Sequence, residues 1–440
     1  DSVSSLGLGC ILAKQSCYLQ LDESPRFLWL IAKQGNSPSL KSLAADNNQR
    51  VARANDTLHK SSHEVSELLS EYLNFPKVDW SSEGISLEDH NLSQEPEVVK
   101  ESAVAFRVVA FCIGIAFGRW DIRYATGERQ PPALPDPFDP LPVCPPGMLQ
   151  NADGLPAAKE DVPDHYPLSI TWPGILVSDP GHPEDIVARV RDALAVIWGD
   201  RASAIEQEAC EILGVRTLRD YFAEKRSGGK FFKDHLKRYS KSRRQAPIYW
   251  PLSTESGTYT LWIYYHRLTE DTLYACITNF VAPKQEQAEK TLARLAAKGD
   301  ARTKAEDKEY EQTEALIGEL ATFRAELERL AKIWKPNLND GVQITAAPLW
   351  NLFRLKPWQK KLKDTWDKLE AGDYDWAHLA HTLWPERVIP KCATDRSLAI
   401  AHGYEEDLWE EVENDKGKLV WQPKEDAGII AQKLIGEGKD

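Results

Sequence analysis

Residues 284–334 constrain the fold of this chain more than any other stretch. Ala, Glu, Lys, Leu and Arg dominate the segment, and these residues have high intrinsic helix propensity. Gly299 and Asp300 interrupt the run near its centre, and a glycine inside a helical pattern marks a break. The pattern predicts an antiparallel helical hairpin with arms near 285–298 and 303–334. The apolar residues that recur at intervals of three and four along the second arm are Leu316, Leu320, Phe323, Leu327 and Leu330.

The same periodicity predicts helices before the hairpin. Three of them are expected near residues 97–119, 183–198 and 202–213. Gly199 and Gly214 follow the last two and are typical helix stops. A further helix begins near Leu273, and we expect it to end at Pro283, because proline lacks the backbone donor that continues a helix.

A small β element is expected near residues 247–268. The run of β-branched and aromatic residues from Tyr259 to His266 is typical of a strand, and IYWPLS precedes it. We therefore predict a mainly α (α+β) fold. Composition divides the chain into a mixed N-terminal segment (1–130), a proline-rich wrapped loop (131–183), a helical and β region with a basic strip (184–283), the hairpin (284–334), and a Trp-rich helical C-terminal region (335–440) whose polar tail after about Asp415 is expected to be loosely ordered.

The cysteine pattern and the hydropathy of the sequence indicate the cellular compartment of the protein. The seven Cys residues are scattered, and no two of them form a CxxC pair. This pattern argues against a disulfide framework or a structural zinc site and predicts a reduced, cytoplasmic protein. No apolar run reaches the roughly 18 to 20 residues that span a bilayer, so we expect no membrane partner.

Motifs for catalysis, cofactor binding and metal binding are weak. Gly7-Leu8-Gly9 lacks the third glycine of a nucleotide-binding loop, and the carboxylates of DPFDP at 136–140 are typical of turns. The candidate metal ligands Asp375, His378, His381 and His402 lack a recognised spacing. We therefore predict no catalytic, cofactor-binding or metal-binding residue in this chain. The clustered residues Trp334, Trp350, Trp358, Trp366, Trp376 and Trp384 could stack on bases, but their spacing favours buried helix packing.

The strongest functional signal is the segment 225–244, KRSGGKFFKDHLKRYSKSRR. It holds nine Lys or Arg residues against one Asp, on a chain whose net charge is −13. Clustered Lys and Arg attract polyanions, and Phe231, Phe232, Leu236 and Tyr239 fall near helical spacing, so one face could dock on the core. A solvated basic helix, with some cations paired to acidic side chains, is the alternative. The predicted DNA-binding residues are Lys230, Lys233, Lys237, Arg238, Lys241, Arg243 and Arg244.

Several long runs resemble a known family. They are IGIAFGRWDI (113–122), RDALAVIWGDRASAIEQEACEILGVRTLRDYF (191–222), FFKDHLKRYSKSRRQAPIYWPLSTESGTYTLWIYYHRLT (231–269), TAAPLWNLFRLKPWQKKLKDTWDKLEAGDYDWAHLAHTLWPERV (345–388) and TDRSLAIAHG (394–403). Together they resemble the C-terminal half of the BREX-type (PglX-like) adenine-specific DNA methyltransferases of bacterial phage defence. These enzymes are related to the large single-chain restriction–modification methylases.

The resemblance implies a role in transferring a methyl group from S-adenosylmethionine to N6 of adenine. The family's Asn-Pro-Pro-Tyr type motif is absent here, so no catalytic or cofactor-binding residue carries over, and whether this chain is itself an enzyme stays open. Residues 1–130 would then hold the end of a truncated target-recognition region, consistent with a chain that starts at Asp1 rather than Met. The expected partners are double-stranded DNA and other proteins of the defence complex. The alternatives are a helical scaffold that docks those proteins without contacting DNA, and a self-sufficient enzyme of another type.

Overall fold

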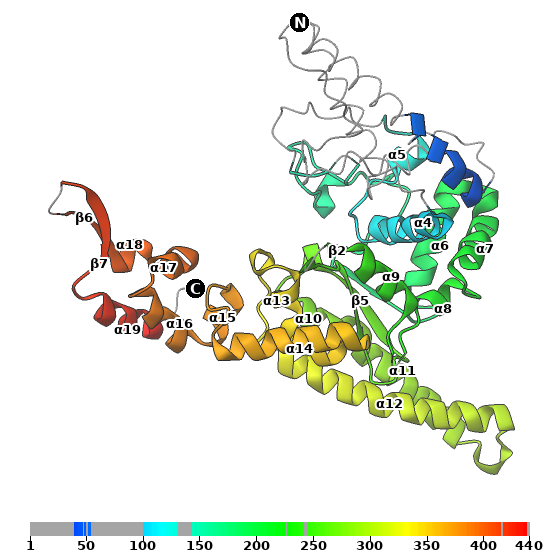
Figure 1. Cartoon of the computed structure of the whole chain (residues 1–440). Helices are drawn as coiled ribbons and strands as arrows, with labels where there is room; N and C mark the ends of the chain where they lie inside the picture. The colour runs from blue at the N-terminus through cyan, green and yellow to red at the C-terminus, as the bar shows by residue number, and fades with distance from the viewer. Residues whose placement is uncertain are drawn as a thin grey trace, which may run out of the picture. The chain divides into compact units, whose positions relative to one another are not determined.

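The computed structural model describes residues 39–46, 48–49, 52–53, 100–130, 143–145, 147–225, 227–241, 244–414 and 417–437. Helices predominate in this part of the chain, with antiparallel sheets of two or three strands (Figure 1), which confirms the predicted mainly α (α+β) class. None of its helices is long and apolar enough to cross a bilayer. The chain divides into two compact units, one made of Asp1–Trp172 and Ile186–Tyr221 and the other of Pro173–Asp185 and Phe222–Asp440.

The first unit is built around a buried helix. Its elements are α4 (Glu101–Ala116), α5 (Arg123–Thr126), η1 (Lys159–Asp161), α6 (Ile186–Trp198), η2 (Gly199–Arg201), α7 (Ala202–Leu213) and most of α8 (Leu218–Phe222). Helix α4 is apolar on nearly every side and packs against α6 and α7. Gly199 and Gly214 adopt φ angles of 55° and 67°, so both predicted helix stops are confirmed.

The second unit contains a three-stranded sheet in the order β1-β5-β4. Its strands β1 (Ile175–Val177), β4 (Tyr249–Ser253) and β5 (Thr260–Tyr264) are antiparallel and entirely buried. Strands β4 and β5 confirm the predicted β element near 247–268. Strand β1 lies in the range 131–183, for which only a wrapped loop was predicted, and this part of that prediction is wrong. Its three residues pair with Leu261, Trp262 and Ile263, far along the chain.

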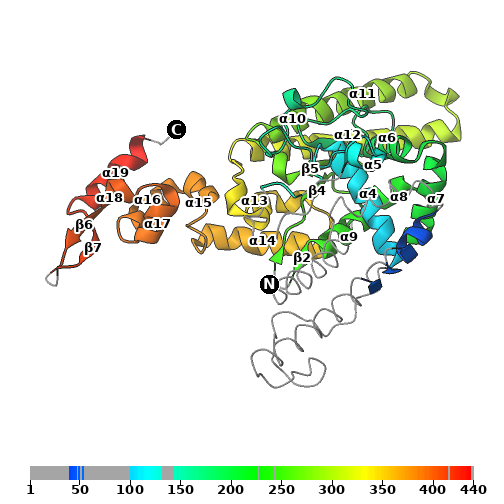
Figure 2. The same cartoon turned by 90° about the horizontal axis from the view of Figure 1, so that it is seen from above.

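The predicted hairpin is present, and Figures 1 and 2 show its arms side by side. Its arms are α11 (Ala282–Ala296) and α12 (Lys304–Ala331), and η5 (Gly299–Ala301) forms the tip. Ion pairs join Lys298 to Glu306 and Arg294 to Glu309, which places the two arms side by side near the tip. Four of the five predicted apolar positions of the second arm are buried, and Leu316 is half-buried.

The predicted helix end at Pro283 is wrong. Helix α10 (Thr272–Cys276) continues through a π-helical turn, η4 (Ile277–Val281), into α11 without a break. Pro283 is the second residue of α11, two positions after the last residue of the π-helical turn. The π turn thus carries the chain past a residue that normally stops a helix.

The remaining elements of the second unit are β2 (Ser240–Lys241), β3 (Arg244–Gln245), α9 (Lys230–Arg238), η3 (Tyr265–Arg267), η6 (Leu338–Asp340), α13 (Val342–Ala346), η7 (Ala347–Leu352), α14 (Lys356–Ala371), α15 (His378–Leu383), α16 (Pro385–Cys392), α17 (Arg396–His402), α18 (Glu405–Leu408), β6 (Trp409–Glu413), β7 (Leu419–Pro423) and α19 (Ala427–Glu437). The expectation of a loosely ordered tail after Asp415 is wrong, because β7 pairs with β6 and α19 packs on α16. Trp334 and Trp358 are buried, as predicted, whereas Trp376 is 48% exposed.

Candidate nucleic-acid interface

The basic segment folds into α9 followed by the two-residue strands β2 and β3. The apolar side of α9 faces the core: Phe231 and Phe232 are fully buried, and Leu236 nearly so. The ring centroids of Phe231 and of Trp262 in β5 lie 5.4 Å apart in an edge-on contact, and those of Phe232 and Phe353 lie 5.9 Å apart. The predicted docking face is therefore confirmed, and Tyr239 lies half-buried at its end.

A buried histidine fixes α9 against the sheet. His235 is fully buried, and its Nε2 accepts the backbone N–H groups of Ile248 at 3.0 Å and Tyr249 at 3.1 Å. An imidazole nitrogen that accepts two N–H groups carries no proton of its own. The helix is thus anchored by a polar contact as well as by aromatic packing.

The opposite side of α9 is cationic. Lys230, Lys233, Lys237 and Arg238 are all exposed on it. Lys241 and Arg244 are also exposed and lie directly opposite each other in the β2–β3 ladder. Arg243 lies outside the described residues. The six described members of the predicted DNA-binding set thus lie on one continuous stretch of chain with exposed side chains.

Pairing with acidic groups does not account for most of these cations. Among the residues that the structure describes, Lys230, Lys233, Lys237, Lys241 and Arg244 form no ion pair within 4.0 Å. Like charges placed opposite each other on neighbouring strands disfavour the pairing. The Lys241–Arg244 pair is therefore an arrangement that an anion would stabilise.

The loop before α9 holds a buried carboxylate that sequence reasoning missed. Glu224 is only 3% exposed; one carboxylate oxygen, Oε2, accepts the Gly229 N–H at 2.8 Å, and Oε1 has no hydrogen-bond partner among the described residues. Burial raises the pKa of Glu224 to about 7, and the Gly229 N–H, Lys233 and Arg354 oppose that rise. In the sequence, Glu224 beside Lys225 reads as an ordinary surface residue.

Two glycines make room for Glu224. A Cβ on Gly229 would lie 2.4 Å from Oε1 of Glu224, and a Cβ on Gly257 would lie 2.2 Å from its backbone oxygen. Gly257 also has a φ of 80°, which disfavours any other residue. The turn between β4 and β5 therefore presses against the loop that leads into α9.

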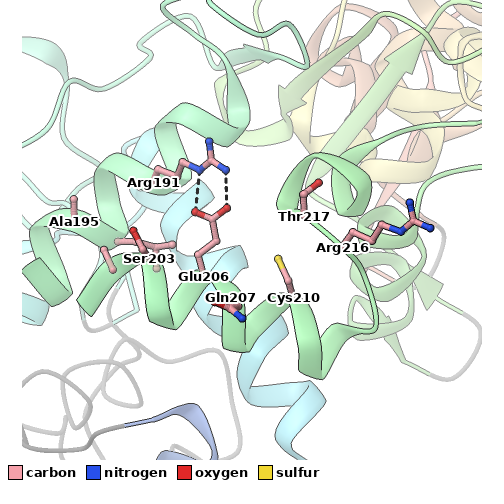
Figure 3. Close-up of a pocket in the computed structure, with 10 residues that line it drawn as sticks. Arg191, Ala195, Ser203, Glu206, Gln207, Cys210, Arg216 and Thr217 are labelled. Atoms are coloured by element: carbon pink, nitrogen blue, oxygen red, sulfur yellow. Dashed lines mark hydrogen bonds and ion pairs between the residues drawn. The ribbon is translucent and has the colours of Figure 1, made fainter. Parts of the chain in front are cut away.

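A cavity in the first unit offers a separate candidate site. It has a volume of about 480 Å³ and lies between α6, α7 and the turn before α8 (Figure 3). The guanidinium of Arg191 donates to both carboxylate oxygens of Glu206, at 2.9 and 2.8 Å. Burial raises the pKa of Cys210 to about 11, so its thiol stays protonated and unreactive at neutral pH. Cys210 is therefore not an activated nucleophile in this cavity.

The structure brings three of the candidate metal ligands together. The His402 ring lies 5.9 Å from His378 and 4.9 Å from His381. The carboxylate of Asp375 binds Arg387 at 2.7 Å and also Lys391, and His402 Nε2 lies 2.7 Å from the Asp375 carbonyl oxygen. In the part of the chain that the structure describes, no set of three or more His, Cys, Asp or Glu side chains is placed so that it could hold a metal ion. Gly7-Leu8-Gly9 and the DPFDP carboxylates lie outside that part.

No protein-family model and no curated protein matches the sequence. The family resemblance of the five sequence runs accordingly stays a hypothesis. The exposed cations of α9, β2 and β3 are the feature on which a function is best argued.

Proposed function

We propose that this chain binds the phosphate backbone of double-stranded DNA through α9 and the β2–β3 ladder. The observation that supports this most directly is the gathering of exposed cations on a helix whose other side is locked into the core. Lys and Arg release condensed counterions when they neutralise phosphates, which drives binding without regard to base sequence. Such contacts position a protein on the duplex, whereas base-edge contacts specify the site.

The larger setting is proposed from the resemblance alone. The chain would be the non-catalytic, C-terminal DNA-engaging portion of a site-specific N6-adenine DNA methyltransferase of a phage-defence system. S-adenosylmethionine and the flipped adenine would be bound by another part of such an enzyme. The task of this portion would be to hold the duplex and partner proteins while methyl transfer takes place elsewhere.

The test compares two quadruple variants of the same charge change. The first replaces Lys233, Lys237, Lys241 and Arg244 by Gln. The control replaces four exposed hairpin cations, Lys290, Arg294, Lys304 and Lys308, by Gln. Affinity for a duplex of about 25 base pairs is measured at several salt concentrations. We expect the first variant to lower the slope of log affinity against log salt by about 0.9 for each phosphate that it no longer neutralises.

The two variants separate DNA binding from the scaffold alternative. If the wild type and both variants bind the duplex equally well, the cations of α9 and the β2–β3 ladder do not contact DNA, and the proposal is contradicted. No duplex binding by the wild-type chain at low salt would favour a scaffold that docks proteins only. Weaker binding by the first variant alone, to the same degree on unrelated DNA sequences, would support backbone recognition.

A further inference from the structure

A second basic run lies next to α9. Residues 354–363, RLKPWQKKLK, contain five Lys or Arg and no acidic residue. They form the turn before α14 and its first half. Lys356 and Lys360 are exposed, whereas Trp358 and Leu362 are fully buried. The first half of α14 thus has the same arrangement as α9, with apolar side chains inward and lysines outward.

The two basic runs meet at Gly228. A Cβ on Gly228 would lie 2.8 Å from the Cα of Leu355, so the loop before α9 touches the residue before α14. Figures 1 and 2 both show α9 and α14 close together. Because consecutive Cα atoms are about 3.8 Å apart, the Cα atoms of Lys230 and Lys356 lie at most about 16 Å from each other.

The two runs also act on one buried carboxyl group, that of Glu224. The carboxyl group of Glu224 interacts electrostatically with Lys233 of α9 and with Arg354 of the second run. Burial lowers the pKa of Arg354, and Glu255, Glu224 and Glu319 oppose that change. The field at one run therefore depends on charges that also act on the other.

We propose that Lys356 and Lys360 belong to the same phosphate-binding surface as α9, so that one DNA duplex lies across both helices. This inference rests on the proposed DNA binding by α9. Duplex DNA carries one negative charge per about 1.7 Å of its axis, so cations about 16 Å apart can meet phosphates of one short segment. Asp234 is the one acidic residue within 225–244, and the second run has none.

Three double variants with the same spacing and charge change test the inference on the full 440-residue chain. They are K356Q/K360Q on α14, K233Q/K237Q on α9, and K304Q/K308Q on α12 as the control. All six lysines are exposed and four residues apart within each pair. Binding to a duplex of about 25 base pairs is measured across a salt series, and thermal unfolding checks that each variant folds.

The expected result is a smaller salt slope for K356Q/K360Q, by up to about 1.8, and roughly tenfold or more weaker binding at about 0.1 M salt. K304Q/K308Q should bind like the wild type. If K356Q/K360Q also binds like the wild type while K233Q/K237Q is weakened, the inference is overturned and the proposed function stands. If neither K356Q/K360Q nor K233Q/K237Q weakens binding, the proposed function falls and this inference falls with it.

Discussion

Helix α9 and the hairpin are both rich in lysine and arginine, but they handle charge in opposite ways. Most of the hairpin's cations pair with acidic neighbours along and between its arms, as Arg324 does with Glu328 and Arg294 with Glu309. Five of the cations on α9 and the β2–β3 ladder have no such partner among the described residues. The number of Lys and Arg residues in a segment therefore says little about function. The balance of positive and negative side chains around them sets the electrostatic potential at the surface, and this potential attracts or repels a charged ligand.

The greatest loss of stability is expected when a side chain that packs α9 against the sheet is truncated. Phe231→Ala removes a fully buried ring that packs against Trp262, and we expect the free energy of unfolding to fall by about 3–5 kcal/mol. Leu316→Ala in the hairpin, where the side chain is half-buried, should cost far less. Urea denaturation of both variants measures the difference. Similar decreases in the two would mean that α9 is no more firmly anchored than the hairpin arm.

The next effect concerns the buried carboxyl group of Glu224. Its pKa is about 7 in the folded chain against 4.5 for the ordinary group, so its contribution to stability is fully present below pH 4.5 and is lost as pH rises to about 7. The loss amounts to about 3 kcal/mol as an upper limit. Glu224→Gln stays neutral at every pH and should be more stable than the wild type at pH 8.

The measurement for Glu224→Gln is the free energy of unfolding at pH 5 and at pH 8. The variant's advantage should appear at pH 8 and shrink toward pH 5. An advantage of the same size at both pH values would show that Glu224 does not titrate between them. The hairpin variant Glu309→Gln serves as the control, because that side chain is 49% exposed.

The weakest effect is expected for an exposed ion pair between the two arms of the hairpin. The Arg294–Glu309 pair joins the two arms at 3.3 Å, with both side chains about half exposed. Exposed pairs contribute little, so a double-mutant cycle with Arg294→Ala and Glu309→Ala should give a coupling free energy of about 0.5 kcal/mol or less. DNA affinity should not change in either single variant. A coupling several times larger would mean that paired surface charge is what holds the arms together.

Local patterns made much of this fold predictable. The hairpin, its tip at Gly299 and the stops at Gly199 and Gly214 follow from helix propensity and glycine, which act within a few residues. The amphipathic character of α9 follows from the spacing of Phe231, Phe232 and Leu236. These features need no knowledge of distant contacts.

The features that sequence reasoning missed depend on distant partners. Strand β1 is three residues long and is defined by its pairing with β5. The burial of Glu224 depends on the turn at Gly257, and the neighbourhood of α9 and α14 depends on the contact between Gly228 and Leu355. The basic run at 354–363 was visible as a charge pattern, but only the fold shows that it lies beside α9.

The two glycines around Glu224 should leave different traces in evolution. Gly229 is confined by the side chain of Glu224, because its Cβ would meet Oε1. Gly257 is confined by the backbone of the same residue and by its own positive φ. Among homologues, a larger residue at position 229 should therefore appear together with a smaller one at 224. Position 257 should stay glycine whatever position 224 becomes.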